Sequence, residues 1–280
     1  MLDMEIAYSL LDSCCVRTNK ALSKPVVVCC VPGFGKTTLI KRLGSLVDCN
    51  IVSGAGSSAD RVKGVRYFSN LRSDAQLNIL DEFQSYQGVL EHFDLIIGDP
   101  SQARGSPEDA QVTPHYTGNR SHRIGSATSK LLSGIGYEII PGHSHDRVKF
   151  ADPYEQDPEG LVIALSEHVA AILRRHSIDC RSVESIQGLE FDEVSVYLEF
   201  PICACELHLL YIALTRHRKT ITIFLLNANS TTERSLQEHI SSISGHCSGT
   251  CHKSVAVSHF TDWWRSLSQI ALRWFVQGRD

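Results

Sequence analysis

Residues 26–43 read VVVCCVPGFGKTTLIKRL, and this stretch decides the fold. The apolar run at residues 26–30 predicts a buried strand, and the residues from Leu39 onward are typical of a helix. A strand that feeds a glycine-rich turn at the start of a helix is the geometry that surrounds a phosphate, because backbone N–H groups face the anion. Lys36 adds a positive charge at the same place. The stretch therefore predicts a nucleoside triphosphate site.

The phosphate loop departs from the usual G-x-x-x-x-G-K-[ST] pattern at one position. Cys30 stands where the first glycine is expected, whereas the part nearest the β- and γ-phosphates is intact. The alternative is a chance glycine-rich turn. The residues expected to bind the nucleotide here are Pro32, Gly33, Phe34, Gly35, Lys36, Thr37 and Thr38. Among them, Thr37 is a predicted Mg²⁺ ligand through its hydroxyl group.

Composition narrows the class of protein. The 280 residues are 42% hydrophobic, which is enough for one large or two small domains. With 27 basic against 31 acidic residues, the net charge of -4 predicts no overall nucleic-acid footprint, so RNA contact would need a local basic strip. The 10 cysteines are scattered and partly lie in apolar runs, which favours reduced thiols in a cytosolic protein. The acidic start and the lack of about 18 consecutive apolar residues predict neither export nor a membrane span.

Strand-like runs alternate with helical patterns, which predicts an α/β fold with parallel sheets. We expect two α/β domains at residues 1–115 and 116–228, and a C-terminal extension at 229–280 that carries an amphipathic helix. Residues 104–125 are rich in Gly, Pro, Ser, Thr and His and are expected to cross between the domains. The expected strands are 26–30, 77–80, 94–97, 137–140, 161–165, 194–198 and 220–226, and the expected helices are 167–175 and 207–215.

Two further motifs offer the groups that phosphoryl transfer needs. Asp81 and Glu82 end a predicted buried strand, so Asp81 could hold Mg²⁺ and Glu82 could orient or deprotonate the attacking water. Gln102 follows the next strand and could bond the γ-phosphate or that water. The plain alternatives are solvated acids at a strand end and an ordinary Asp-Pro turn. The carboxyl ends of neighbouring parallel strands would bring these groups together.

Six stretches in order resemble the main motifs of the superfamily 1 RNA helicases of positive-strand RNA viruses. They are VPGFGKTT at 31–38, ILDEF at 79–83, LIIGDPSQ at 95–102, NRSHRI at 119–124, SVESIQGLEFDEV at 182–194 and LLYIALTRHR at 209–218. The resemblance implies two RecA-like P-loop NTPase domains with parallel sheets. It also implies that Arg123 and Arg216 are second-domain arginines that reach the γ-phosphate across a cleft. It also implies that Gln187, Gly188 and Glu190 link the nucleotide to the RNA strand. Without it, Arg216 would be a basic helix end favoured by the helix dipole.

Within that superfamily, the chain is most similar to the movement helicases of the triple gene block of filamentous plant viruses. This resemblance implies an ATP- and Mg²⁺-dependent RNA-binding NTPase that carries viral RNA through plasmodesmata and can suppress RNA silencing. It further implies a host-cytoplasm location, with single-stranded viral RNA, coat protein, the other triple-gene-block proteins and further copies of itself as partners. Because the nucleotide motif begins about 30 residues from Met1, we expect no capping, methyltransferase or polymerase region before it. The alternatives are a non-catalytic scaffold of the same fold, a replicase helicase fragment and a small P-loop kinase.

The C-terminal extension carries two patterns that the motifs do not use. His246, Cys247, Cys251 and His252 form H-C-x₃-C-H, but adjacent ligand pairs this close are strained around one tetrahedral ion, so zinc binding is not the favoured interpretation. Apolar residues then recur at helical spacing between 260 and 274. Such a helix would pack on the protein's own core or lie against a membrane surface or a partner.

Overall fold

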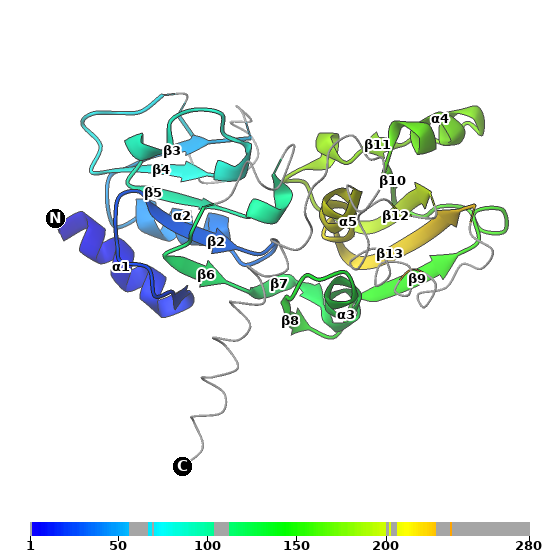
Figure 1. The fold of residues 1–280 in the computed structure, drawn as a ribbon, viewed down its shortest axis with the longest axis horizontal. Helices are drawn as coiled ribbons and strands as arrows, with labels where there is room; N and C mark the ends of the chain where they lie inside the picture. The colour runs from blue at the N-terminus through cyan, green and yellow to red at the C-terminus, as the bar shows by residue number, and fades with distance from the viewer. Residues whose placement is uncertain are drawn as a thin grey trace, which may run out of the picture. The chain divides into compact units, whose positions relative to one another are not determined.

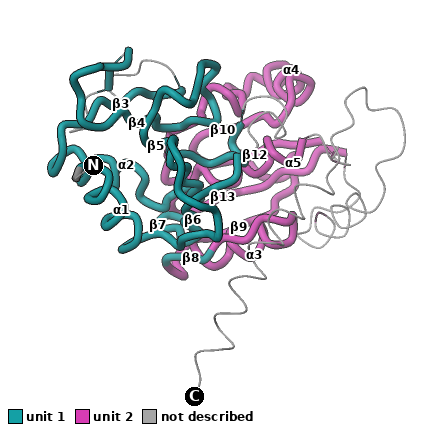
Figure 2. The backbone as a smooth tube through the Cα atoms, turned by 60° about the vertical axis from the view of Figure 1, so that its left-hand side comes forward, with its two compact units in different colours: residues 1–123, 140–142 teal, residues 124–139, 143–280 magenta. Residues whose placement is uncertain are grey.

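The computed structural model describes residues 2–55, 67–68, 70–103, 112–199, 202, 206–227 and 236 (Figure 1). The chain forms two compact α/β units (Figure 2). Unit 1 comprises residues 1–123 and 140–142, and unit 2 comprises residues 124–139 and 143–280. Each unit is built around a largely parallel sheet, as the alternation of strands and helices predicts.

Unit 1 has a six-stranded sheet in the order β1-β6-β2-β5-β4-β3. The strands from β2 to β6 run parallel to their neighbours, and only the short β1 pairs antiparallel, with β6. The elements of the sheet and its covering segments are α1 (Leu2–Cys14), β1 (Val16–Arg17), β2 (Val26–Cys30), α2 (Lys36–Gly44), β3 (Cys49–Ser53), β4 (Leu77–Asp81), η1 (Phe83–Ser85), η2 (Leu90–His92), β5 (Leu95–Gly98), η3 (Pro100–Gln102) and β6 (Tyr116–Gly118). After these come β7 (Arg120–Gly125) and β8 (Ile140–His143), which form a separate two-stranded sheet.

Strand β2 lies at the centre of unit 1 and is buried on both faces. Its alternate residues therefore enter two different cores. Val26 and Val28 pack with buried residues of α1 and α2 on one face of the sheet. Val27 and Cys29 pack on the opposite face, in a cluster that contains the buried ring of Phe83. Burial on both faces explains why this strand reads as an uninterrupted apolar run, as is usual in parallel sheets.

Unit 2 has an entirely parallel five-stranded sheet in the order β11-β10-β12-β13-β9. Its elements are α3 (Ser126–Gly134), β9 (Arg147–Ala151), β10 (Leu161–Ala164), α4 (Glu167–Arg175), β11 (Arg181–Ser182), η5 (Glu184–Ile186), β12 (Phe191–Glu199), α5 (Leu207–Leu214) and β13 (His217–Leu226). The apolar side of α4 packs on the sheet through Val169 and Leu173. Tyr211 of α5 stacks on Tyr137, with ring centroids 4.1 Å apart.

The structure differs from the sequence-based expectation at the domain boundary. Residues 116–123 were expected in the second domain, but β6 pairs with β2, with Val28 opposite Tyr116. Within the expected 104–125 crossover, residues 116–118 therefore belong to the unit 1 sheet. The strand expected at 137–140 is displaced to β8, because Tyr137 packs as a stacked ring rather than as part of a ladder. The expected helix at 167–175 is confirmed.

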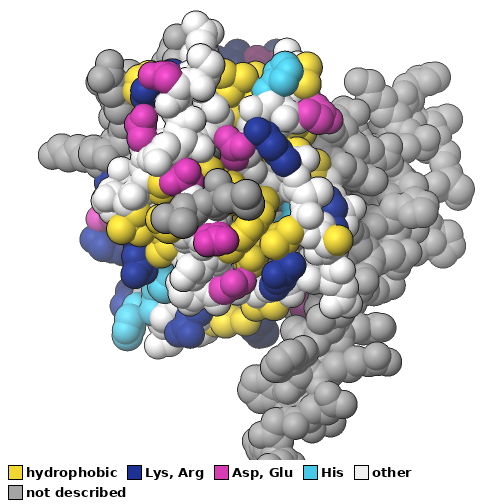
Figure 3. Space-filling view, turned by 90° about the vertical axis from the view of Figure 1, so that its left-hand side faces the viewer, with side chains coloured by type: hydrophobic (Ala, Val, Ile, Leu, Met, Phe, Trp, Pro, Cys, Tyr) yellow, Lys and Arg dark blue, Asp and Glu magenta, His cyan; other side chains and the backbone are white. Residues whose placement is uncertain are grey.

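On the face shown in Figure 3, basic and acidic side chains are interspersed among those that are coloured by type. Over the described ranges, no helix is long and apolar enough to cross a membrane. The H-C-x₃-C-H cluster and the 260–274 helix lie outside the described residues.

Candidate functional site

The phosphate loop joins β2 to α2 and has the backbone that the sequence predicts. Gly33 and Gly35 have φ angles of 74° and 102°, which are conformations that L side chains rarely adopt. Gly35 is the residue that caps α2, and no side chain caps the first turn. The N–H groups of that first turn, which includes Lys36, Thr37 and Thr38, therefore point to a place that suits an anion.

The loop packs closely against the strands that follow it. A Cβ atom at Gly33 would lie 2.5 Å from Ser121 Oγ and 2.6 Å from Arg123 Cβ, so only glycine fits there. The Gly33 carbonyl accepts a hydrogen bond of 2.8 Å from the His122 amide. The ring of Phe34 lies against Gly118, where a Cβ would be 2.4 Å from the ring. These contacts fix the conformation of the loop between β2 and α2.

Lys36 lies among carboxylates at the first turn of α2. Burial by itself lowers its pKa, but the negative charges of Glu82, Asp99 and Asp81 outweigh that effect, so the pKa of Lys36 is raised. The ammonium group therefore stays protonated at neutral pH. A lysine held in its charged form beside an open helix N-terminus is suited to binding β- and γ-phosphate oxygens.

Asp81 ends β4 and is 5% exposed. Burial and the neighbouring Glu82 charge raise the pKa of Asp81 to about 6. Both of its oxygens accept hydrogen bonds: Oδ2 from the Tyr67 hydroxyl at 2.8 Å and Oδ1 from the Glu82 amide at 3.0 Å. The carboxylate thus has a fixed plane and retains acceptor sites for water on Mg²⁺.

Glu82 has φ 53° and ψ 46°, a left-handed conformation that is uncommon outside glycine. Its carbonyl lies so close to Gly54 that a Cβ at Gly54 would be 2.3 Å away. Its carboxylate accepts a 2.5 Å hydrogen bond from Gln84 Nε2. Strained backbone of this kind concentrates at functional sites, and here it turns the Glu82 side chain away from the direction that the strand would give it.

The third motif is joined to the second by side-chain hydrogen bonds. Gln84 Oε1 accepts from the Asp99 amide at 3.1 Å, and Asp99 Oδ2 accepts from Gln102 Nε2 at 3.1 Å. Gln102 is 4% exposed. Sequence reasoning missed Gln84, Asp99 and Tyr67 as members of this site. The motif LIIGDPSQ already contained Asp99, whereas Tyr67 lies 14 residues before Asp81 and carries no local signal.

Arg123 belongs to unit 1, which corrects the expectation that it is a second-domain residue. It lies on β7, and its backbone N–H donates to Ser121 Oγ at 3.2 Å beside the phosphate loop. The correction follows from the β6 pairing, because residues 119–124 leave the unit 1 sheet directly after that strand. Its proximity to Gly33 keeps it a candidate phosphate-site residue.

Arg216 lies in unit 2 at the end of α5 and is 2% exposed. Its Nε donates to the Ile212 carbonyl at 3.0 Å, and Nη2 donates to Thr215 Oγ1 at 3.0 Å. Nη1 lies 3.5 Å from the Leu189 carbonyl. The guanidinium therefore closes its own helix end and contacts the loop of the fifth motif.

The fifth-motif residues lie together between η5 and β12. Gln187 is buried, Gly188 has φ 80°, and Glu190 forms an ion pair of 3.2 Å with Arg218. The positive φ explains the need for glycine at this turn. The structure thus joins the fifth and sixth motifs within unit 2, and the link to an RNA strand stays a prediction.

The residues of unit 1 fit a nucleotide with Mg²⁺. No three His, Cys, Asp or Glu side chains among the described residues could hold a metal ion by themselves. Mg²⁺ is usually bound by one or two protein groups together with substrate phosphates and water. Thr37, in the first turn of α2, and Asp81 are the residues here that would supply those groups.

Comparison with known proteins agrees with this geometry. A model of the viral superfamily 1 RNA helicase core domain matches residues 26–225. The movement and silencing protein TGBp1 of Chrysanthemum virus B is 33% identical over 77% of this chain and 93% of its own length. The protein of the same name from Poplar mosaic virus is 32% identical over 79% of this chain and 96% of its own length.

Among solved structures, the arterivirus nonstructural protein 10 helicase is 18% identical, with a TM-score of 0.47. The match covers 82% of this chain and 58% of that chain.

Proposed function

The chain belongs to the viral superfamily 1 RNA helicases, and we propose that it is an RNA-dependent NTPase that hydrolyses ATP with Mg²⁺ in unit 1. The observation that carries the proposal is the open phosphate loop with Lys36 among the carboxylates of Glu82, Asp99 and Asp81. A partly buried lysine whose pKa is shifted by several neighbouring carboxylates, next to a glycine-rich turn at a helix N-terminus, is typical of a functional site.

Each group has a distinct task in the proposed reaction. When bound, Mg²⁺ would supply positive charge to the phosphates of the nucleotide. Asp81 would hold that ion through its water shell, and Lys36 places positive charge on the phosphate oxygens. Glu82 accepts a proton from the attacking water while the oxygen of that water forms a bond to the γ-phosphorus. The bond from that phosphorus to the β–γ bridging oxygen breaks, and ADP and phosphate are the products.

We propose that both arginines act on the γ-phosphate, Arg123 from unit 1 and Arg216 from unit 2. Arg123 lies at the phosphate loop and would stabilise charge that develops on the γ-phosphate. Arg216 would do the same only after its guanidinium leaves the Ile212 carbonyl and Thr215. We propose that binding of the nucleotide competes with the hydrogen bonds of the Arg216 guanidinium to its own helix end. We also propose that the two units are RecA-like domains.

At the level of the cell, the proposal follows the relatives. Proteins named movement and silencing protein TGBp1 match this chain over most of their length. We infer that this chain likewise moves viral RNA between host cells and suppresses RNA silencing. Single-stranded viral RNA is the proposed ligand, and coat protein and other movement proteins are proposed partners in the host cytoplasm.

The direct test is RNA-stimulated ATP hydrolysis by the purified full chain. We expect Lys36→Ala and Glu82→Gln to reduce the rate by at least about 100-fold, because each removes a group that acts in the transition state. Lys41→Ala is the matched control, since Lys41 is an exposed lysine on the same helix. Equal rates in all four proteins would contradict the catalytic proposal and favour an RNA-binding scaffold.

A further inference from the structure

Tyr67 touches the carboxylate that would organise Mg²⁺. Its hydroxyl donates to Asp81 Oδ2 at 2.8 Å, and the Glu82 amide donates to Oδ1 at 3.0 Å. Because Asp81 is buried, loss of a hydrogen-bond donor to its carboxylate would cost free energy that solvent water does not readily restore. The two hydrogen bonds act on different oxygens and together fix the rotation of the carboxylate about its last bond.

A short paired segment brings Tyr67 to this place. Tyr67 forms an isolated parallel bridge with Ile51 of β3, and the Phe68 amide donates to the Ile51 carbonyl at 2.8 Å. Ile51 is opposite Ile79, two residues before Asp81 on β4. Two residues of strand rise by about 6.6 Å, which is close to the reach of a phenol side chain. The Tyr67 hydroxyl therefore lies at the carboxyl end of β4, although the Tyr67 backbone is level with Ile79, two residues earlier in that strand.

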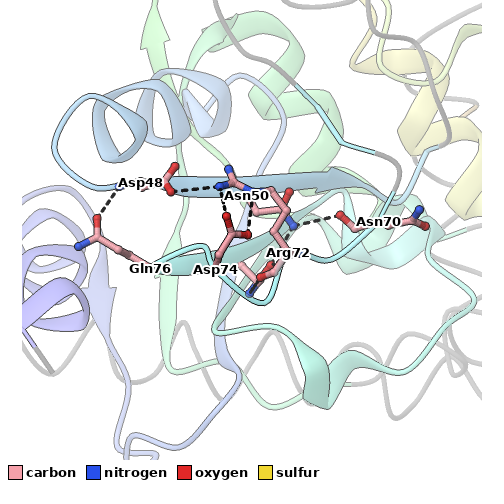
Figure 4. Close-up of polar contacts among 7 residues, drawn as sticks. Asp48, Asn50, Asn70, Arg72, Asp74 and Gln76 are labelled. Carbon is pink, nitrogen blue, oxygen red and sulfur yellow. Dashed lines mark hydrogen bonds and ion pairs between the residues drawn. The ribbon is translucent and has the colours of Figure 1, made fainter.

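The other end of this segment is anchored by a polar network (Figure 4). We call residues 67–68 and 70–76 the tyrosine strap. Asn50, which is fully buried, donates from Nδ2 to the Asn70 carbonyl at 3.1 Å and to Asn78 Oδ1 at 2.8 Å. Asn78 in turn donates from Nδ2 to the Arg72 carbonyl at 3.2 Å. These bonds join the strap to β3 and β4 at their amino ends.

Arg72 adds a second anchor to the strap. Its guanidinium donates to both oxygens of Asp74, at 3.2 and 3.0 Å, and lies 3.4 Å from Asp48. The same group lies 5.6 Å from the ring centroid of Phe68, the neighbour of Tyr67. The contact with Asp48 joins the strap to the residue before β3, whereas the contacts with Asp74 and Phe68 hold the strap's own conformation. The bridge to Ile51 and the Phe68 amide hydrogen bond hold the backbone at Tyr67, and a side chain held in place is suited to orienting another.

We propose that Tyr67 is a positioning residue for the metal-binding step, with its hydroxyl aligning Asp81 toward the water shell of nucleotide-bound Mg²⁺. The inference rests on the proposed NTPase function of unit 1. The tyrosine touches neither nucleotide nor metal in this assignment. Loss of the hydroxyl leaves the Asp81 carboxylate free to rotate and leaves its Oδ2 without that donor. The carboxylate then has the orientation that metal binding needs in a smaller fraction of the molecules.

The test is the binding of a fluorescent ATP analogue to the full chain, with and without Mg²⁺. In Tyr67→Phe, which keeps the ring, we expect unchanged affinity without the metal, because Lys36 and the phosphate loop are intact. The Mg²⁺ concentration for half-maximal binding enhancement and half-maximal hydrolysis should rise by about 10-fold or more, as is typical when a group that supports a metal ligand is lost.

Tyr116→Phe is the matched control, because the Tyr116 hydroxyl also donates to a carboxylate in unit 1, Asp12 Oδ1 at 3.0 Å. It should leave the Mg²⁺ dependence at the wild-type value. A wild-type Mg²⁺ dependence in Tyr67→Phe, or an equal shift in both variants, would overturn the inference. Failure of the NTPase proposal is distinguished by a wild-type protein that does not hydrolyse ATP at any Mg²⁺ concentration.

Discussion

Three glycines at or after the phosphate loop allow backbone strain and crowding to be measured separately. Gly33 has φ 74°, and an added Cβ would meet Ser121 Oγ at 2.5 Å and Arg123 Cβ at 2.6 Å. Gly35 has φ 102°, but its nearest neighbour would be Thr38 Cβ at 4.0 Å. Gly44 ends α2 and would meet no atom within 4 Å. Alanine at each position therefore tests a different combination of effects.

The expected changes follow from these distances. Gly35→Ala should lower the free energy of unfolding by about 1–3 kcal/mol, the cost of a strained φ alone. Gly33→Ala carries that cost and an overpacking cost of about 1–3 kcal/mol, because backbone and Cβ atoms cannot rotate away as a long side chain can. Gly44→Ala should raise the free energy of unfolding by about 0.5–1 kcal/mol, because alanine loses less backbone entropy in a helix.

The assay is urea unfolding followed by circular dichroism, with the ATP hydrolysis rate measured on the same samples. From the most to the least stable protein, the expected order is Gly44→Ala, wild type, Gly35→Ala and Gly33→Ala. Equal losses for Gly33→Ala and Gly35→Ala would refute the reasoning, since they would mean that Ser121 and Arg123 do not press on the loop. Gly44→Ala should hydrolyse ATP at the wild-type rate.

Three further predictions concern titratable groups outside the proposed reaction. His115 is buried and its Nδ1 accepts a 2.9 Å hydrogen bond from the Val27 amide, and burial lowers the pKa of His115 below 6.5. The unfolded chain therefore binds this proton more readily, so the stability that neutral His115 contributes is present above pH 6.5 and is lost as the pH falls through the lowered value. Urea titrations between pH 7.5 and pH 5 should show a smaller decline in His115→Gln than in wild type, and parallel curves would contradict this. Asp146 accepts hydrogen bonds from the Ala127 and Thr128 amides at 3.1 and 2.9 Å at the start of α3, so Asp146→Ala should cost about 1–3 kcal/mol in the same assay, the usual penalty for buried donors left without acceptors. An unchanged urea midpoint would contradict that role. Burial raises the pKa of the Cys29 thiol, which is 6% exposed, so peptide mass spectrometry should find slow iodoacetamide labelling of Cys29 at pH 8 unless urea is added.

Several elements of both units are predictable because their signals are local. The strand at residues 26–30 is buried on both faces and reads as one apolar run, and the glycines that follow it have the positive φ angles that a phosphate loop needs. The helix at 167–175 follows from its apolar spacing and from Ser166, whose hydroxyl caps the Val169 amide at 3.2 Å. These features depend on residues within a few positions of one another, so a sequence pattern records them.

The partners of each strand are not recorded in the same way. The three-residue strand β6 lies in a stretch rich in Gly, Thr and His and looks like a linker, yet its pairing with β2 places Arg123 in unit 1 rather than in the second domain. The guanidinium of Arg216 is drawn onto its own helix end at Ile212, which no motif indicates. Strand pairing and side-chain bonding across the chain depend on which surfaces meet, and periodicity does not specify them.

The sequence by itself therefore determined the family, the phosphate loop and the acidic pair Asp81 and Glu82, because each depends on residue type at fixed local spacing. Only the tertiary structure decided that a tyrosine 14 residues away holds Asp81, and that Arg123 lies beside Gly33. The physical reason is that a site in a parallel sheet is assembled from loops at the ends of different strands, and their convergence depends on strand order, which is a property of packing rather than of any one segment.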